Sequence, residues 1–368
     1  MTLTSTPTQS PAPTPTSQAP RITAGRLPTW VPWALLGASA LLSLLIFGIL
    51  AVADGSGINI AGVLVVTALA YLVLITIVSS MIEGRRKAVD RLVTGVVSTA
   101  FAIAMVPLIS LGVTAITNGV AGLSAAFFTE SMRNVVGEGG GALHAIIGTV
   151  LVTLAAAIIS IPIGLFTAIY LVEYGAGKRL AQGITFLVDV MTGIPSIVAG
   201  LFAYALFALF LGPGIRLGIM GAIALSVLMI PVVVRSSEEM LRLVPNELRE
   251  AAYALGVPKW LTIVKVVLPT SIAGITTGIM LSIARVIGET APLLITAGFT
   301  TSMNYNLFEG RMMTLPVFTY TQFINQGIPA EAYINRAWAA ALVLIALVMA
   351  LNILARLIAR IFAPKFGR

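Results

Sequence analysis

The chain has 368 residues, of which 58% are hydrophobic and only 10% are charged, and its formal net charge is +8. This apolar content exceeds what one soluble core can bury, so the composition excludes a soluble enzyme and indicates a polytopic membrane protein. The chain has no cysteine and a single histidine, His144, which excludes thiol chemistry and leaves little scope for imidazole chemistry.

The first 28 residues, MTLTSTPTQSPAPTPTSQAPRITAGRLP, consist mainly of Thr, Pro, Ser and Gln. A segment of this composition cannot bury enough apolar surface to fold. We therefore predict a disordered cytoplasmic tail over residues 1–28.

Eight apolar runs follow, each long enough to cross the roughly 30 Å hydrocarbon core of a bilayer as a helix. They lie near residues 31–53, 58–82, 92–117, 145–172, 182–211, 217–234, 270–297 and 337–360. The first run ends in AVAD, which resembles a signal-peptidase site. Because its apolar stretch of about 22 residues exceeds the 7–15 of a signal peptide, we expect it to remain as a span.

The predicted fold is therefore all-α, a polytopic integral membrane protein with eight spans. The short turn DGSG joins the first two runs into an additional transmembrane hairpin over residues 29–83. The remaining residues, 84–368, form the main membrane domain.

The basic residues indicate the orientation of these spans. With the N-terminus in the cytoplasm, only four of the 22 Lys and Arg residues lie in outside loops, and one more, Arg285, lies within the seventh run. The four are Arg133, Arg216, Arg311 and Arg336. Because cytoplasmic loops of membrane proteins carry an excess of Lys and Arg, we predict that both termini are cytoplasmic.

The longest cytoplasmic loop, residues 235–269, contains the segment LVPNELREAAYALGVPKW. Pro245 suits a first helical turn, and Gly256 followed by Pro258 suits a helix stop, so we expect a helix of about 11 residues and about 16 Å. Four residues fall on one side of it: Leu248, Ala251, Ala252 and Leu255. A helix this short is marginal alone and must pack, either on its own membrane domain or on a partner.

The same segment resembles the EAA motif of ABC-importer permeases. The matching residues are Glu250, Ala251, Ala252, Gly256, Leu268 and Pro269, while Val266 stands where the family usually has Ile. The resemblance implies a six-helix type I permease core over 84–368, with a coupling helix in this loop that inserts into a groove on a cytoplasmic ATPase.

The chain contains no G-x-x-x-x-G-K-[ST] segment, the loop that cradles phosphates in P-loop ATPases. We therefore expect no cofactor on this chain, and the resemblance implies that ATP and Mg are bound by a partner ATPase. The chain is then a transporter subunit and not an enzyme.

Three further segments resemble the permeases of phosphate-specific ABC importers: GEGGGALHAIIGTVLVTL at 137–154, GIPSIVAGLFAY at 193–204 and ARVIGETAPLLITAG at 284–298. The continuation GETAPLL is similar to PstA-type permeases, and the resemblance covers residues 90–368. It implies a bacterial cytoplasmic membrane location, a PstC-like permease as heterodimer partner, two copies of a PstB-like ATPase, and a PstS-like extracytoplasmic phosphate-binding protein.

Arg285 and Glu289 are charged residues predicted within a span, where a charge costs about 2.5–3.5 kcal/mol, so they should face protein or water. Their spacing of four allows a structural ion pair. Alternatively, with the adjacent Thr290, they form a transient anion site, because a guanidinium offers a fork of donors that matches phosphate oxygens. The sequence leaves both readings open.

Several other features have simpler explanations. We expect residues 137–141 to be a flexible outside lead into the fourth span, and His144 to be an interfacial hydrogen-bonding residue. Asp189 is expected to snorkel or to cap the fifth span. Prolines at or inside the apolar runs permit kinks: Pro162, Pro195, Pro231 and Pro292.

Other functions remain alternatives at this point. A permease for another oxyanion, molybdate or sulfate, would share the same motifs. A secondary transporter or channel would need no docking helix. A membrane hydrolase would need an acid, base and nucleophile set that one histidine and no cysteine do not supply.

Overall fold

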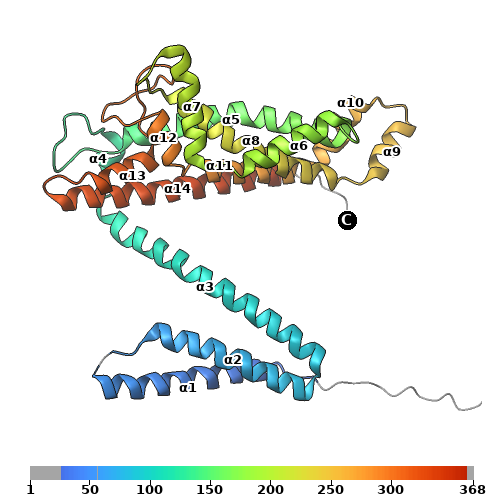
Figure 1. Cartoon of the computed structure of the whole chain (residues 1–368), viewed down its shortest axis with the longest axis vertical. Helices are drawn as coiled ribbons and strands as arrows, with labels where there is room; N and C mark the ends of the chain where they lie inside the picture. Colours follow the sequence, from blue (N-terminus) through green and yellow to red (C-terminus); the bar gives the residue numbers. More distant parts are fainter. Residues whose placement is uncertain (1–25, 56, 363–368) are drawn as a thin grey trace, which may run out of the picture. The chain divides into compact units, whose positions relative to one another are not determined.

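The computed structural model describes residues 26–55 and 57–362. Within these ranges the regular structure is entirely helical (Figure 1). The predicted tail lies outside the described residues up to residue 25. The chain divides into two compact units, Met1–Ser110 and Leu111–Arg368.

The first unit contains a helical hairpin. Helices α1 (Val31–Asp54) and α2 (Ile60–Ile82) pack side by side, and the turn between them begins at Gly55, whose φ is 61°. The Asn59 side chain caps α2 by accepting a hydrogen bond of 3.0 Å from the Gly62 N–H. This confirms the predicted hairpin.

Helix α3 (Arg85–Ala121) begins directly after Gly84 and runs across the division between the two units at Ser110. The first part of α3 therefore groups with the hairpin, whereas the sequence placed the domain boundary at residue 83. Pro107 lies inside α3 without ending it.

The second unit contains the remaining elements. In chain order they are α4 (Ala125–Thr129), α5 (Leu143–Ile169), the π-helix η1 (Tyr170–Tyr174), α6 (Arg179–Thr192), α7 (Ser196–Leu211), α8 (Gly218–Arg242), α9 (Asn246–Ala254), α10 (Lys259–Thr262), the π-helix η2 (Ile263–Val267), α11 (Leu268–Val286), α12 (Ala291–Thr296), α13 (Leu315–Ile324) and α14 (Ala330–Phe362).

Helix α8 lies at the centre of this unit and packs against α5, α7 and α11, while α14 packs against α11 and α13. The buried face of α8 is rich in small residues, including Gly221, Ala222 and Ala224. Small side chains allow helix backbones to approach closely, which is the usual way for membrane helices to gain packing contacts. The core of the unit is therefore built around α8.

Seven of the described helices are long and apolar enough to span a membrane, or eight spans if one bent pair counts as a span. The bent pair is α6 and α7, which meet at an angle of 110° around Gly193 to Pro195. Pro195 has no N–H and disfavours a helical conformation in the residue before it, and here α6 ends at Thr192 and α7 begins at Ser196. The fifth predicted span is therefore broken.

The boundaries of two other predicted segments are wrong. Helix α8 continues to Arg242, and the next candidate span begins at Lys259, so the segment between the two spans, which contains α9, covers only residues 243–258 and not 235–269. Leu268 and Pro269 lie at the start of α11 and not in the loop. The seventh span, predicted over 270–297, ends at Val286, and α12 follows as a separate short helix.

Candidate functional site

Helix α9 forms the tip of the second unit, next to α10 and away from α4 and α13 (Figure 1). It runs for nine residues and not eleven, with Pro245 immediately before its first residue. At its end the Gly256 N–H donates to the Tyr253 carbonyl at 2.9 Å, and the Val257 N–H donates to the Ala252 carbonyl at 3.1 Å. This Schellman turn requires a left-handed residue, which Gly256 supplies with φ 75°.

The predicted packed side of α9 is only partly correct. Ala252 is buried, and Leu248 packs against a cluster that includes Leu241, Val244 and Val267. Ala251 is exposed, and the Leu255 side chain is 83% exposed. The helix thus packs on its own unit along one edge and leaves the other edge uncovered.

Four of the six motif residues lie in α9 or in the turn that follows it, and three of these four are exposed. Glu250, Ala251 and Gly256 are exposed, and only Ala252 is buried. This exposed edge, with the apolar Leu255 beside small and charged residues, is accessible to another protein.

Arg249 anchors α9 to the membrane helices. Its guanidinium donates to Glu173 Oε1 at 2.9 and 3.1 Å, to the Val244 carbonyl at 2.6 Å and to the Leu241 carbonyl at 2.9 Å. The side chains of Arg249 and Glu173 are only 12% and 5% exposed. The fork therefore joins α9, the end of α8 and η1 in one buried contact.

Lys259 adds a second link between these elements. Its ammonium donates to the backbone carbonyl of Glu173 and lies 4.9 Å from the ring centroid of Tyr174. Helix α9 thus contacts both π-helices, η1 through the pair of Arg249 with Glu173 and η2 directly. Single turns of π-helix occur often at functional sites.

A further charged network lies on the adjacent part of α8. Glu238, which is buried, accepts from Arg235 at 2.9 Å and from Arg242 at 2.6 Å, and Arg235 also pairs with Asp189 of α6. The Asp189 side chain, predicted to snorkel or to cap its helix, is 58% exposed and pairs across to α8. Sequence reasoning missed this network, as it missed Glu173 and Arg249.

The segments at 193–204 and 284–298 meet in the fold. Helices α7 and α12 pack together, and a Cβ on Gly200 would lie 2.6 Å from the Cα of Pro292. On the other side of α12, a Cβ on Gly221 of α8 would lie 2.9 Å from the Leu293 side chain. We call this contact of α7, α8 and α12 the glycine contact; it depends on the absence of side chains.

The third segment, at 137–154, contacts a different part of the unit. A Cβ on Gly148 of α5 would overlap the backbone carbonyl of Met313, just before α13. The loop 137–141 does lead into α5, as predicted, but Arg336 ties it down by donating to the carbonyls of Gly137 and Gly139 at 2.7 and 2.9 Å.

The prediction for His144 is wrong. The side chain is 2% exposed, and neither ring nitrogen has a hydrogen-bond partner among the described residues. The ring packs edge-on against Phe318 with a centroid distance of 5.5 Å. His144 is thus a buried packing residue.

Arg285, Glu289 and Thr290 lie at the break between α11 and α12. Arg285 is in the last turn of α11 and is exposed, while Glu289 and Thr290 follow the helix end and are half-buried. Because α11 ends at Val286, the helical spacing of four that would align Arg285 with Glu289 is lost. Among the described residues, Arg285 forms no ion pair within 4 Å.

Comparison with known proteins identifies relatives of this chain. The family model described as "Binding-protein-dependent transport system inner membrane component" matches residues 160–368. "Phosphate transport system permease protein PstA 1" of Mycobacterium tuberculosis (strain CDC 1551 / Oshkosh) is 47% identical over 277 residues, which cover 74% of this chain and 90% of that protein.

Two more distant comparisons agree. "Phosphate transport system permease protein PstA" of Yersinia pestis is 43% identical over 252 residues, covering 68% of this chain and 82% of that protein. The solved structure of an inward-facing MetNI methionine ABC transporter has a chain with a TM-score of 0.50 and 19% identity, covering 60% of this chain and 96% of that one. The match of the family model and the high identity over most of each relative show that this chain belongs to the binding-protein-dependent transport system inner membrane components.

Proposed function

We propose that this chain is the PstA-like permease subunit of an ATP-driven phosphate importer in the bacterial cytoplasmic membrane. Its relatives that are 43–47% identical are named phosphate transport system permeases. The observation that carries the mechanism is α9: a short helix fixed at its base by buried Arg249 and exposed along the edge that bears Glu250, Ala251 and Leu255.

The coupling step follows from this arrangement. A cytoplasmic ATPase that grips the exposed edge of α9 can pull or push it, and the contact of Arg249 with Glu173 and with the Leu241 carbonyl passes the displacement to η1 and α8. Leu268 and Pro269 lie at the start of α11, directly after η2, so the motion reaches α11 as well. ATP and Mg belong to that ATPase, and this chain binds no cofactor in the proposal.

The partners follow from the same assignment. We expect a PstC-like permease beside this chain, two PstB-like ATPases below it, and a PstS-like binding protein delivering inorganic phosphate from outside. Both termini and α9 are placed in the cytoplasm because the basic residues are concentrated on that side.

Arg285, Glu289 and Thr290 are the proposed groups of the phosphate path. The guanidinium of an exposed arginine in a membrane helix needs water or polar groups around it, and a polar path shared with the second permease would supply them. The missing pair with Glu289 favours the anion reading over the structural ion pair, because it leaves the guanidinium fork available for phosphate oxygens.

The test uses proteoliposomes of the assembled transporter with unlabelled ATP on the cytoplasmic side and radiolabelled phosphate with the binding protein on the other. We expect ATP-dependent uptake of label that excess unlabelled phosphate suppresses and excess sulfate or molybdate does not. Stronger competition by sulfate or molybdate would assign the permease to that oxyanion. Uptake that is independent of ATP would instead indicate a secondary transporter or channel.

A matched pair of variants tests the coupling role in the same assay. Gly256 and Gly177 both have φ 75° and open space at the Cβ position, but only Gly256 follows α9. Gly256→Trp should abolish ATP-driven uptake while the chain remains inserted, and Gly177→Trp should retain most of it. Equal uptake by the two variants would contradict the coupling role of α9.

A further inference from the structure

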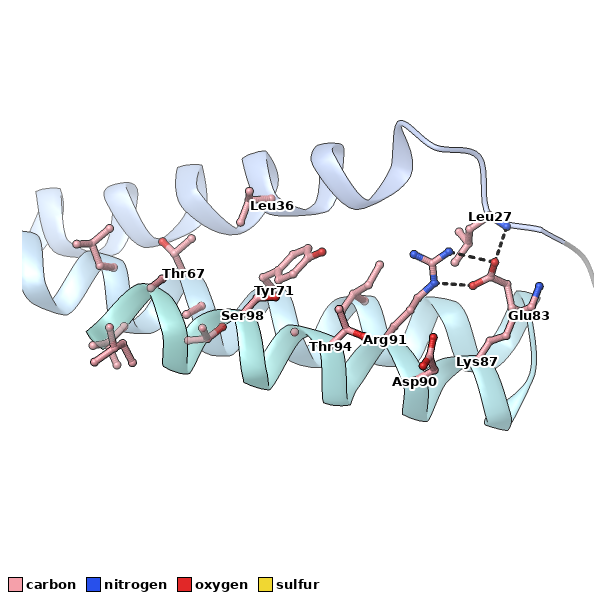
Figure 2. Close-up of a pocket in the computed structure, with 18 of the residues that line it drawn as sticks. Leu27, Leu36, Thr67, Tyr71, Glu83, Lys87, Asp90, Arg91, Thr94 and Ser98 are labelled. Carbon is pink, nitrogen blue, oxygen red and sulfur yellow. Dashed lines mark hydrogen bonds and ion pairs between the residues drawn. The ribbon is translucent and has the colours of Figure 1, made fainter. Parts of the chain in front are cut away.

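A cavity of about 1000 Å³ lies in the first unit between α2 and the first part of α3 (Figure 2). All of its lining residues fall between Arg26 and Val106, so it belongs to this unit alone. It is separate from α9 and from the proposed phosphate path, and its size suits a small-molecule ligand.

The lining of the cavity changes from charged to apolar along its length. The charged residues gather at the corner where α2 turns into α3, and Figure 2 shows Glu83, Lys87, Asp90 and Arg91 together at this end. The apolar lining includes Leu64, Val65, Ala68, Ile103 and Val106. An amphipathic molecule, with a polar head and an apolar tail, matches this division.

The length of the cavity matches one leaflet of a bilayer. The lining of α3 extends from Arg91 to Val106, which is about 22 Å at 1.5 Å per residue. One leaflet contributes about 15 Å of hydrocarbon, with the headgroup region beyond it. Since α2 and α3 are both candidate spans, the apolar part of this cavity lies at the depth of the acyl chains.

The charged end has an excess of positive charge. Glu83 is neutralised by Arg91, whose guanidinium donates to both carboxylate oxygens at 2.7 and 3.1 Å. Arg26, Lys87 and Asp90 also line this end, and none of them forms an ion pair within 4 Å among the described residues. Arg26 and Lys87 carry two positive charges against the one negative charge of Asp90, so this end can bind an anionic group. The Asp90 carboxylate can accept a hydrogen bond from a hydroxyl of the ligand.

The hydroxyl groups between the two ends lack partners. Tyr71, Thr94 and Ser98 line the middle of the cavity, whereas Thr67 lies farther along α2, beside Ala68 (Figure 2). None of these hydroxyls hydrogen-bonds to a described residue. In the same unit, Ser43 and Thr76 donate to the carbonyl four residues earlier, at 2.9 and 2.6 Å. The cavity therefore presents free donors at the depth where a lipid carries its ester oxygens.

From these features we infer that the cavity binds one anionic phospholipid, with its phosphate at Arg26 and Lys87, its glycerol backbone beside the hydroxyls of Tyr71, Thr94 and Ser98, and an acyl chain against Ala68 and Ile103. A free phosphate ion would use only the charged end and leave the apolar lining in contact with water. A helix of a partner protein would cover the apolar lining but bring no phosphate to the cations. Basic pockets between membrane helices on the cytoplasmic side are known to suit anionic headgroups.

Spin-labelled lipid measures this binding in proteoliposomes of the assembled transporter that contains the full chain. Electron paramagnetic resonance gives the immobilised fraction of labelled phosphatidylglycerol and of labelled phosphatidylcholine. We expect preferential immobilisation of phosphatidylglycerol, and a loss of about fivefold or more in the preference for the double variant Arg26→Gln, Lys87→Gln.

The matched control is the double variant Arg85→Gln, Arg86→Gln. These two arginines are exposed at the start of α3 but do not line the cavity, so they test general attraction to the surface. The control should keep the preference, and Ala68→Trp, which fills the apolar part, should abolish immobilisation of either lipid at this site.

Three results would overturn the inference. One is equal immobilisation of the two lipids by the wild-type transporter, which is also the result expected if a protein helix fills the cavity. Another is an equal loss of the preference for phosphatidylglycerol in the Arg26→Gln, Lys87→Gln variant and in the Arg85→Gln, Arg86→Gln control. The third is displacement of the lipid by glycerol phosphate at the same concentration, which would mean that the headgroup alone accounts for binding.

Discussion

The base of α9 and the glycine contact of α7, α8 and α12 are held together by opposite means. At α9, buried Arg249 joins three elements through hydrogen bonds and one ion pair. At the glycine contact, Gly200 and Pro292 touch because no side chain intervenes. Polar contacts can break and re-form when the helices move relative to one another. A close steric contact between backbones tolerates almost no such movement.

This difference suggests how the two regions divide the work of transport. The polar base of α9 is suited to follow a partner that moves, because its bonds can exchange partners. The glycine contact is suited to keep α7, α8 and α12 together as one body while that motion occurs. Substitutions in each region can test the two roles separately.

The largest effect is expected for Arg249→Met. The substitution leaves the buried carboxylate of Glu173 without its partner, which typically costs about 3–5 kcal/mol, and it removes the link from α9 to η1. We expect a large fall in the thermal stability of the purified transporter and little ATP-driven uptake.

Arg242→Met is the control for this prediction. Arg242 also pairs with a glutamate, but its side chain is 66% exposed, so its loss should cost about 1 kcal/mol or less. If both variants melted at the same temperature, Arg249 would not be the anchor of α9.

The next largest effect on stability is expected for Gly200→Val. The new side chain would meet the backbone of Pro292, and overpacking of this kind costs about 1–3 kcal/mol. We expect less monodisperse protein in size-exclusion chromatography. Gly183→Val on α6, where no atom lies within 4 Å of the Cβ position, should give a normal profile. A normal profile for both would remove the rigid role of the glycine contact.

A smaller effect on stability, with a large one on transport, is expected for Arg285→Gln. The neutral amide keeps polarity but loses charge-assisted bonds to phosphate, so uptake should fall strongly while assembly is retained. Arg285→Lys should recover only part of the rate, because an ammonium lacks the planar fork.

The double variant Arg285→Gln, Glu289→Gln separates the two explanations for Arg285. If Arg285 contacts phosphate in the path, the double variant should remain as poor in uptake as the single variant. Restored assembly and restored uptake together would instead make Arg285 a member of a structural ion pair.

The smallest effect on stability is expected for Glu83→Gln. Glu83 forms a polar junction in the first unit with Arg91, Leu27 and Ser79, and this junction can be compared with the base of α9. The Arg91 guanidinium lowers the pKa of Glu83 to about 2 from an ordinary value of 4.5, and the Leu27 N–H and the Ser79 hydroxyl add to this shift. Because the folded-state pKa is the lower one, the ionised carboxylate stabilises the fold above pH 4.5.

That stabilisation is lost as the pH falls from 4.5 towards 2. At neutral pH the Leu27 amide hydrogen should therefore exchange faster in the Glu83→Gln variant than in the wild type. The difference between the two exchange rates should shrink as the pH falls from 4.5 towards 2. A difference that stays constant from pH 7 to pH 2 would exclude the ionised carboxylate as its cause.

The comparison of the two regions also explains what could be predicted from the sequence. The spans and α9 were predictable because apolar length, Pro245 and Gly256 are local signals. The break after Val286 was not, because residues 287–298 are nearly as apolar as the helix before them. The bend at Pro195 was visible as a proline but not as an angle of 110°.

The contacts that hold both regions together join residues far apart in the chain. Glu173 lies 76 residues from Arg249, and nothing in the local sequence marks it as a partner. Gly200 and Pro292 each belong to a segment that resembles the family, but only the fold brings them together. The motifs could thus be found from the sequence, whereas their pairing could not.

The central claim is that the exposed edge of α9 is the surface through which a partner ATPase drives phosphate uptake. The chain contains no cysteine, so a single cysteine can be placed at will. ATP-driven uptake of radiolabelled phosphate should be lost when Leu255→Cys carries a bulky maleimide added before assembly with the ATPase. It should be retained when the same group is on Val136→Cys, which is 89% exposed and lies between α4 and α5 in the same unit, where α4 is far from α9 (Figure 1). Full uptake with the maleimide at position 255 would contradict the claim.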